Sequence, residues 1–204
     1  MEPNPVVSRE EWLVARKAHL AREKELTRLR DQVNAERRAL PWVAVEKRYV
    51  FDTPEGKRTL ADLFAGRSQL VVYHFMFAPG AAEGCDGCSF LADHIDGANL
   101  HLAHHDVSVV AVSRAPLADF QPFKERMGWR FAWVSSAGSN FNHDFGVSFT
   151  PEQVAAGDVG YNYGTTPYAH EDLPGLSVFY EDAAGRVIHT NSTNARGLDQ
   201  LVGA

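Results

Sequence analysis

The chain has 204 residues, of which 45% are hydrophobic and 23% are charged, an ordinary balance for a globular protein. A chain of this length buries roughly 70% of its unfolded surface and needs no disulfide to form a core. The formal net charge of −6 disfavours nucleic acid and anionic membrane surfaces as partners.

The sequence contains no apolar run near the roughly 20 residues that a membrane-spanning helix needs. The N-terminus, MEPNPVVSREEW, lacks the cationic start and the apolar middle of a secretory signal. Secreted domains use several cysteine pairs as structural bridges, whereas this chain has only Cys85 and Cys88. We therefore expect a cytoplasmic protein whose cysteine pair serves chemistry in a reducing compartment.

Residues 1–41 predict an amphipathic helical extension. Ser8 followed by Glu11 forms a capping box at its start, and Pro41 is expected to end it. Between them one stripe of residues recurs every three or four positions among Arg, Lys and Glu: Trp12, Ala15, His19, Leu26, Leu29 and Val33. The stripe packs either on the rest of the chain or on a second copy, which would give a homodimer through this helix.

Residues 42–204 predict strands that alternate with helices. Strand patterns occupy 43–51, 69–77, 107–113 and 131–135, and a hairpin lies within 176–191. Helical patterns occupy 58–64, 86–104, 116–128 and 195–202. This order predicts an α/β fold, a three-layer α/β/α domain with a mixed central sheet. The segment 147–174 is rich in Gly, Tyr and Pro, lacks periodicity and is expected to be a long loop insertion.

The stretch GAAEGCDGCSF carries both cysteines between a predicted buried strand and a predicted helix. A thiol attacks a disulfide only as thiolate, and a helix N-terminus stabilises that anion. This placement makes Cys85 the candidate nucleophile and Cys88 the candidate resolving thiol of disulfide exchange. Two alternatives stay open: a zinc half-site completed by histidines such as His101 and His105, and cysteines that only pack as small hydrophobes.

Several segments resemble known families. The stretches LVVYHFMF, CDGC, VSVVAVS and LPGLSVFYEDAAGRV follow the order of the thioredoxin-like superfamily, and FDTPEGKRTLADLFAGRSQLVVYHF resembles the start of its peroxiredoxin and thiol-reductase branch. More closely, YHFMF, GCDGCSF, AVSRAP, GWRFAWVSS and NFNHDFGVSFT resemble the bacterial domain-of-unknown-function family 899, described as predicted dithiol–disulfide oxidoreductases. The resemblance covers essentially the whole chain. It implies a thioredoxin-like fold and a CxxC dithiol that exchanges disulfides without metal or cofactor, acting on a disulfide-containing protein or small molecule and reset by an external thiol reductant.

The resemblance also implies roles outside the CxxC motif. Pro174, after Leu173, corresponds to the superfamily's cis-proline, whose neighbours bind a substrate's extended chain; a trans turn proline is the alternative. His74 falls where thioredoxins place a buried acid beneath the cysteines, so it is either a proton shuttle or a packed core residue. Apart from the resemblance, the aromatic residues Tyr161 and Tyr163 in the long loop either cover the cysteines and select the substrate or pack the loop onto its own domain.

An acid between the two cysteines is unusual for thioredoxin relatives. Asp86 in the first helical turn stabilises the helix but competes with the Cys85 thiolate for the same positive end. We therefore expect Asp86 to raise the pKa of Cys85 and to make the dithiol comparatively reducing.

Two other functions compete with disulfide exchange. A peroxiredoxin-like peroxidase would carry a Thr three residues before the attacking cysteine and an Arg near the hairpin strand. This chain has Ala82 at the first place and no Arg within 174–177. The other alternative is a non-catalytic thioredoxin-fold binding or assembly module that uses the N-terminal helix as its contact surface.

Overall fold

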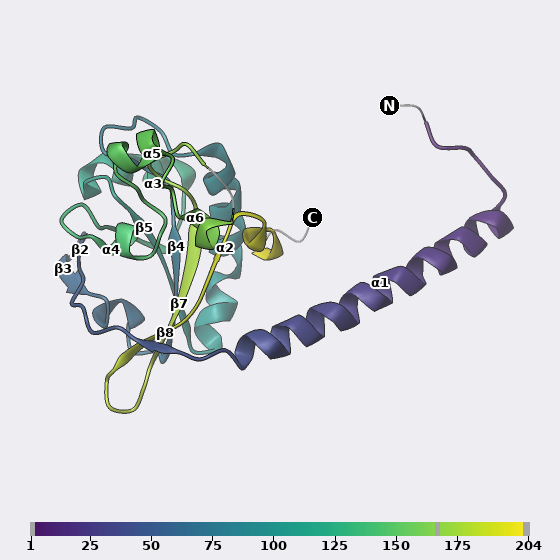
Figure 1. Cartoon of the computed structure of the whole chain (residues 1–204), viewed down its shortest axis with the longest axis horizontal. Helices are drawn as coiled ribbons and strands as arrows, with labels where there is room; N and C mark the ends of the chain where they lie inside the picture. The colour runs from purple at the N-terminus through teal and green to yellow at the C-terminus, as the bar shows by residue number, and fades with distance from the viewer. Residues whose placement is uncertain (1–2, 166–167, 202–204) are drawn as a thin grey trace. The chain divides into compact units, whose positions relative to one another are not determined.

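The computed structural model describes residues 3–165 and 168–201, and the chain divides into two compact units, Met1–Pro41 and Trp42–Ala204. The first unit is built on one long helix, α1 (Arg9–Arg38) (Figure 1). The Ser8 hydroxyl accepts a hydrogen bond from the Glu11 amide at 3.2 Å, and the Ser8 amide donates to the Glu11 carboxylate at 2.9 Å. The predicted capping box is therefore confirmed, and the helix ends three residues before Pro41.

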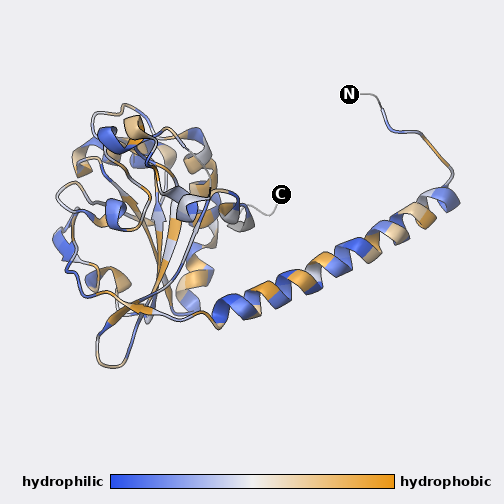
Figure 2. Ribbon diagram, in the orientation of Figure 1, coloured by the Kyte–Doolittle hydropathy of each residue, from blue (hydrophilic) through white to orange (hydrophobic). Residues whose placement is uncertain are grey.

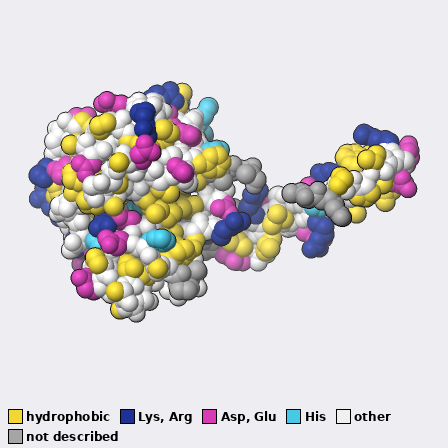
Figure 3. Space-filling view, turned by 90° about the horizontal axis from the view of Figure 1, so that it is seen from above, with side chains coloured by type: hydrophobic (Ala, Val, Ile, Leu, Met, Phe, Trp, Pro, Cys, Tyr) yellow, Lys and Arg dark blue, Asp and Glu magenta, His cyan; other side chains and the backbone are white. Residues whose placement is uncertain are grey.

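Hydrophobic and charged residues alternate along α1 (Figure 2), and both kinds appear on its surface in the space-filling view (Figure 3). Trp12, Leu26 and Leu29 of the predicted stripe are all exposed. An association of this helix with a second copy of the chain stays a prediction.

The described part of the second unit is built on one mixed sheet in the strand order β1-β8-β7-β4-β5-β6-β2-β3. Its strands are β1 (Val43–Ala44), β2 (Val50–Thr53), β3 (Gly56–Thr59), β4 (Gln69–His74), β5 (Val107–Ser113), β6 (Ala132–Ser135), β7 (Gly175–Glu181) and β8 (Val187–Asn194). The central strands β4, β5 and β6 are parallel to one another, and the other pairings are antiparallel.

Helices cover both faces of this sheet. They are η1 (Asp62–Phe64), α2 (Asp86–His104), α3 (Leu117–Met127), α4 (Phe141–Asp144), α5 (Pro151–Ala156), α6 (Tyr161–Gly164) and η2 (Ala195–Leu201). Side chains of α2 and α3 form one core with Tyr73 of β4, whereas side chains of η1 and α4 form a second core with Val72. Because neighbouring residues of a strand point to opposite faces, these cores lie on opposite sides of the sheet. The predicted three-layer α/β fold is confirmed.

Four element predictions differ from the structure. The helical pattern expected at 58–64 is helical only at Asp62–Phe64, because residues up to Thr59 belong to β3, which pairs with β2. The single strand expected at 43–51 is two strands, because β1 pairs with β8 while β2 pairs with β3 and β6 near the opposite edge. The central strand ends at His74, not at residue 77. The expected loop 147–174 contains α5 and α6; α5 starts at a capping box formed by Thr150 and Gln153, with a proline in its first turn. Residue 202 of the predicted closing helix lies outside the described residues.

None of the helices within 3–165 and 168–201 combines the length and the hydropathy needed to cross a membrane.

Candidate active site

The cysteine pair opens helix α2, as the sequence predicts. Cys85 is the N-cap residue, with extended backbone angles (φ −60°, ψ 131°), and its sulfur accepts a hydrogen bond from the Cys88 amide at 3.4 Å. Cys85 is partly exposed, whereas Cys88 is buried, and neither forms a disulfide. The motif therefore presents one accessible thiol and one thiol directed into the protein.

The loop before the motif passes close to the core. A Cβ atom at Gly84 would lie 2.9 Å from the rings of both Phe75 and Phe123, closer than real Cβ contacts. A glycine at this position lets the backbone lie against two buried aromatic side chains. The approach fixes the start of α2 relative to the end of β4.

The two thiols differ in acidity. A hydrogen bond from the Cys88 thiol, helped by the amides of Cys88 and Gly87, lowers the pKa of Cys85 to about 6, against the opposing effect of partial burial. The same hydrogen bond and its own burial raise the pKa of Cys88. At neutral pH the pair thus holds an accessible thiolate beside a buried, protonated thiol.

Asp86 acts in the expected direction. Its charge raises the pKa of Cys85, but it ranks last among the five causes that set this pKa. The hydrogen bond from Cys88 and the helix amides therefore outweigh the carboxylate.

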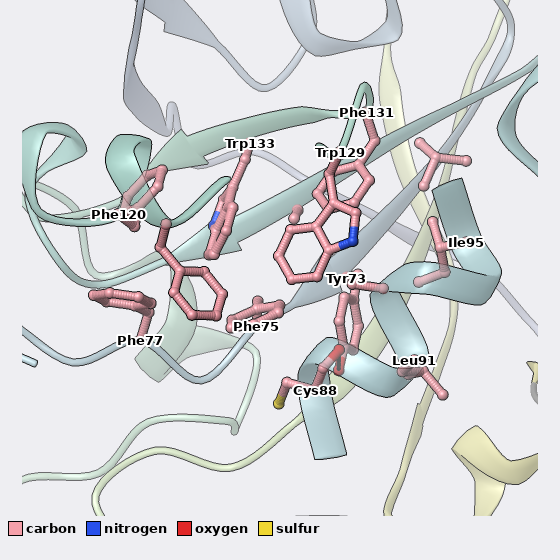
Figure 4. Packing of buried hydrophobic residues seen from close by; sticks show 14 of the residues in the cluster. Tyr73, Phe75, Phe77, Cys88, Leu91, Ile95, Phe120, Trp129, Phe131 and Trp133 are labelled. Atoms are coloured by element: carbon pink, nitrogen blue, oxygen red, sulfur yellow. Dashed lines mark hydrogen bonds between the residues drawn. The ribbon is translucent and has the colours of Figure 1, made fainter. Parts of the chain in front are cut away.

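Tyr73 of β4 lies directly beside the buried cysteine (Figure 4). Its hydroxyl donates to the Cys88 carbonyl oxygen at 3.5 Å, and its position beside the Cys88 side chain lowers the pKa of that thiol. Burial strongly raises the pKa of Tyr73, so its hydroxyl stays protonated and acts as a donor. The sequence reasoning missed Tyr73, although strand alternation puts it on the opposite face from its neighbour His74.

The wall behind Tyr73 and Cys88 is aromatic, as Figure 4 shows. Trp133 lies at its centre, with ring centroids 4.5 Å from Phe75 and 4.6 Å from Phe120. The Trp133 indole N–H donates to the Ser113 hydroxyl at 2.9 Å, so its one polar atom is satisfied. Such close-packed rings make a rigid, low-dielectric support for the buried thiol.

The expectation that His74 serves the cysteines as a proton shuttle is wrong. His74 is 1% exposed and belongs to the other face of the sheet, where its ring stacks on Phe141 and Phe145. Its Nε2 lies 2.9 Å from the Ser177 hydroxyl. Burial, with a smaller contribution from His189, lowers the pKa of His74 to about 3. His74 is therefore a neutral core residue separated from the thiols by the sheet.

The proposed roles of Leu173 and Pro174 also need correction. The peptide bond before Pro174 is trans, since the described residues include no cis peptide. The Leu173 amide donates to the Val147 carbonyl at 2.9 Å, and the Pro174 carbonyl accepts from the Tyr161 hydroxyl at 2.6 Å. The Leu173 amide is therefore engaged within the chain, the cis form of Pro174 is corrected to trans, and a role of these residues in substrate binding stays a prediction.

The two loop tyrosines have separate surroundings. Tyr161 is 1% exposed; besides donating to Pro174, its hydroxyl accepts from the Ala195 amide at 2.8 Å, so it fastens α6 to the ends of two strands. Tyr163 lines a cavity with His189, on the face of the sheet opposite the cysteines. Tyr161 thus packs the loop onto its own domain, and Tyr163 does not cover the thiols.

The loop is held by an ion pair that the sequence did not reveal. Arg114, directly after β5, forms two hydrogen bonds of 2.6 and 2.7 Å with Asp172, which also accepts from Ser148.

The histidines considered for zinc lie at the far end of α2, with His101 in its last turn and His105 as its C-cap. The helix therefore separates them from the cysteines by most of its length.

The chain matches, over residues 1–204, the family described as bacterial protein of unknown function (DUF899). The search of curated proteins found no match. Among solved structures, the chain is similar to peroxidoxin BcpB from Mycobacterium tuberculosis, with a TM-score of 0.53 and 17% identity over 80% of this chain and 92% of that chain. A peroxiredoxin Q from Xanthomonas campestris gives a TM-score of 0.53 and 16% identity over 78% and 94%. These likenesses show the thioredoxin-like fold, and the match over the full length shows that the chain belongs to the DUF899 family.

Proposed function

We propose that this protein is a thiol–disulfide oxidoreductase that uses the Cys85–Cys88 dithiol. The observation that carries the proposal is the asymmetry of the pair: Cys85 is partly exposed, caps a helix and has a pKa of about 6, whereas Cys88 is buried and has a raised pKa. A thiolate that is also accessible is the species that attacks a disulfide.

The exchange has two steps. The Cys85 thiolate attacks one sulfur of a substrate disulfide; that S–S bond breaks, and the leaving thiolate takes up a proton. Cys88 then loses its proton and attacks the Cys85 sulfur, which releases the second substrate thiol and leaves a Cys85–Cys88 disulfide. The substrate gains two electrons and the dithiol loses two, and an external thiol reductant restores it.

Tyr73 assists the second step by stabilising the thiolate that Cys88 must form. Cys88 must become a thiolate inside a core that disfavours charge. The Tyr73 hydroxyl, which lies beside Cys88, and the Met76 backbone amide both lower the pKa of this thiol. We assign Tyr73 as the residue that stabilises the Cys88 thiolate while it attacks.

Peroxide reduction is the competing function of the same thiol. In that reaction Cys85 would attack a peroxide oxygen, and donors around the thiolate would hold the second oxygen. The groups that lower the pKa of Cys85 here are Cys88 and two backbone amides, with no arginine among them. The donor set therefore favours exchange between sulfurs. We propose a disulfide-containing protein or small molecule as the substrate class and a reducing compartment such as the cytoplasm as the setting, because there an external thiol keeps the dithiol reduced.

A Cys88→Ser variant is expected to accumulate mixed disulfides between Cys85 and a substrate, because the second step has no thiol. Insulin, whose disulfides serve as a general substrate, is incubated with the variant, and adducts are measured by non-reducing electrophoresis and mass spectrometry. Cys85→Ser is the matched control and should form none. Equal adduct formation by both variants, or none by Cys88→Ser, would falsify the exchange proposal. Consumption of hydrogen peroxide in place of insulin disulfides would favour the peroxidase.

A Tyr73→Phe variant is expected to slow the resolving step by about tenfold or more, the effect of losing a hydrogen bond to a charged group. To measure this step, the Cys85 mixed disulfide is prepared first and the reaction is quenched at successive short times. The amount of the second substrate thiol released at each time gives the rate. The rate at which Cys85 is alkylated should stay unchanged, because Tyr73 acts on Cys88. A variant that slows both steps equally would show that Tyr73 only supports the packing.

A further inference from the structure

A hollow of the domain lies on the face of the sheet away from the cysteines. It is a cavity of about 270 Å³, and its wall includes Asp144 and Phe145 at the end of α4, Asn162 and Tyr163 of α6, and His189 and Ser192 of β8. Helix α6 lies beside β8 (Figure 1). Tyr163 is 74% exposed, so the cavity reaches the surface.

A bulge in β8 puts two polar side chains into this wall together. Residues three apart in a regular strand point to opposite faces, yet His189 Nε2 lies 2.8 Å from the Ser192 hydroxyl. The register of β8 against β7 shifts between Val178 and Phe179, which adds one residue to β8. Thr190 lies at this shift, and its hydroxyl donates to the Val178 carbonyl at 3.1 Å. Bulges of this kind re-aim side chains and are frequent beside binding sites.

The polar wall continues into the core as a chain of hydrogen bonds. The Ser192 hydroxyl lies 3.0 Å from the Ser177 hydroxyl, which lies 2.9 Å from Nε2 of His74. His74 is 1% exposed, and among the described residues its Nδ1 has no partner. A buried imidazole with an unsatisfied nitrogen costs stability that an apolar side chain would avoid. This row of hydrogen-bonded side chains links the cavity wall to the buried His74.

One side of the cavity is formed by a strained turn. Asn162 and Tyr163 have left-handed backbone angles, with φ of 50° and 61°, which are unfavourable for a tyrosine. The Tyr163 hydroxyl donates to the Ser192 carbonyl at 2.9 Å and holds the turn against β8. Strain of this kind, maintained by a specific hydrogen bond, is typical of ligand sites.

The charges of the residues that line the cavity limit which ligands it can bind. Against the effect of partial burial, hydrogen bonds from Lys47 and Tyr49 lower the pKa of Asp144, so its carboxylate is charged. Both hydrogen bonds use Oδ2, and among the described residues none uses Oδ1. Burial lowers the pKa of His189, which keeps that imidazole neutral at pH 7. The residues that line the cavity include no Lys or Arg in the described chain.

From this geometry we infer that the cavity is a binding site for a small uncharged or singly positive molecule that offers a hydroxyl or an ammonium group and one flat face. The hydroxyl or ammonium group donates to Asp144 and meets the Ser192–His189 pair. The flat face lies against the rings of Phe145 and Tyr163. An anionic molecule is disfavoured, because the cation beside the wall, Lys47, is already paired with Asp144 and no other Lys or Arg lines the described cavity.

Three probes of one shape and different charge test this site: benzyl alcohol, benzylamine and benzoate. Each is titrated into the ¹⁵N-labelled full chain, and the amide signals of Asn162, Tyr163 and Ser192 are followed. Benzyl alcohol and benzylamine are expected to shift these signals in a saturable way, and benzoate is expected to leave them unchanged. No saturable shift with either donor, or equally tight binding of benzoate, would overturn the inference.

Two variants locate the binding. Ser192→Ala is expected to weaken binding of the two donor probes by about fivefold, the loss of one neutral hydrogen bond. Ser68→Ala is the matched control, since the Ser68 hydroxyl bonds Asp106 instead of the cavity. Cys85→Ser should bind the probes like the wild type, so failure of the exchange proposal and failure of this site give different results. If Ser192→Ala binds the two donor probes with wild-type affinity, the assignment of this cavity as their binding site is wrong.

Discussion

Cys85 is expected to react with iodoacetamide with a midpoint near pH 6, and Cys88 is expected to stay unmodified at neutral pH. At pH 7 a thiol with a pKa of about 6 is about 90% thiolate, whereas an ordinary cysteine with a pKa of about 8.5 is about 3% thiolate. The rate should therefore rise from pH 5 to pH 7 and then level off. Quantitative mass spectrometry of the alkylated peptide across this range measures the midpoint. A midpoint near pH 8.5 would contradict the proposed nucleophile.

Two variants separate the causes of this low pKa. Cys88→Ala should move the midpoint upward, because the hydrogen bond from Cys88 is the largest cause. Asp86→Asn should move it downward, since the carboxylate raises the pKa of Cys85. Replacement of the exposed Asp158 by Asn serves as the control for loss of a carboxylate. An unchanged midpoint in Asp86→Asn would remove this residue from any account of how reducing the pair is.

The free energy of unfolding is expected to fall as the pH drops below about 6.5, because His74 is buried in its neutral form. In the unfolded chain this imidazole takes up a proton near pH 6.5, whereas in the folded chain its pKa is lowered to about 3. Between these values the unfolded state binds more protons, so each pH unit lost removes up to about 1.4 kcal/mol of stability. Urea denaturation at pH 7, 6, 5 and 4 measures the loss.

A His74→Leu variant should show a flatter dependence over the same range, because no imidazole remains to be protonated on unfolding. His189, whose pKa burial also lowers, keeps part of the dependence in the variant. His104→Leu, at an exposed position on α2, is the control for replacing a histidine. Identical slopes for wild type and His74→Leu would show that His74 does not contribute to the acid sensitivity.

Local patterns were enough to predict most elements of this fold. Helix α2 runs over the predicted residues, since its first turn follows a long apolar strand and its spacing is regular. The position of the cysteines followed from the same pattern. The two strands within 43–51 could not be separated, because both parts have strand-like residues and only distant pairing divides them.

The site beyond the cysteines was harder to predict, because it depends on which face each side chain occupies. Strand β4 has Tyr73 and His74 next to each other, and both are plausible partners for a thiol. A loop of ten residues separates His74 from Cys85, so the sequence does not give the register. The engagement of Pro174 with Tyr161 depends on the fold of the loop that carries α6, where periodicity was absent.

The pairing of β1 with β8 has a consequence for the order in which the chain acquires its structure. Val43 near the start pairs with His189 near the end, so this edge of the sheet forms only after nearly the whole chain has been synthesised. The parallel core of β4, β5 and β6 depends on much shorter separations and can assemble earlier. We therefore expect the strands that support the dithiol to pair before β1 finds its partner β8.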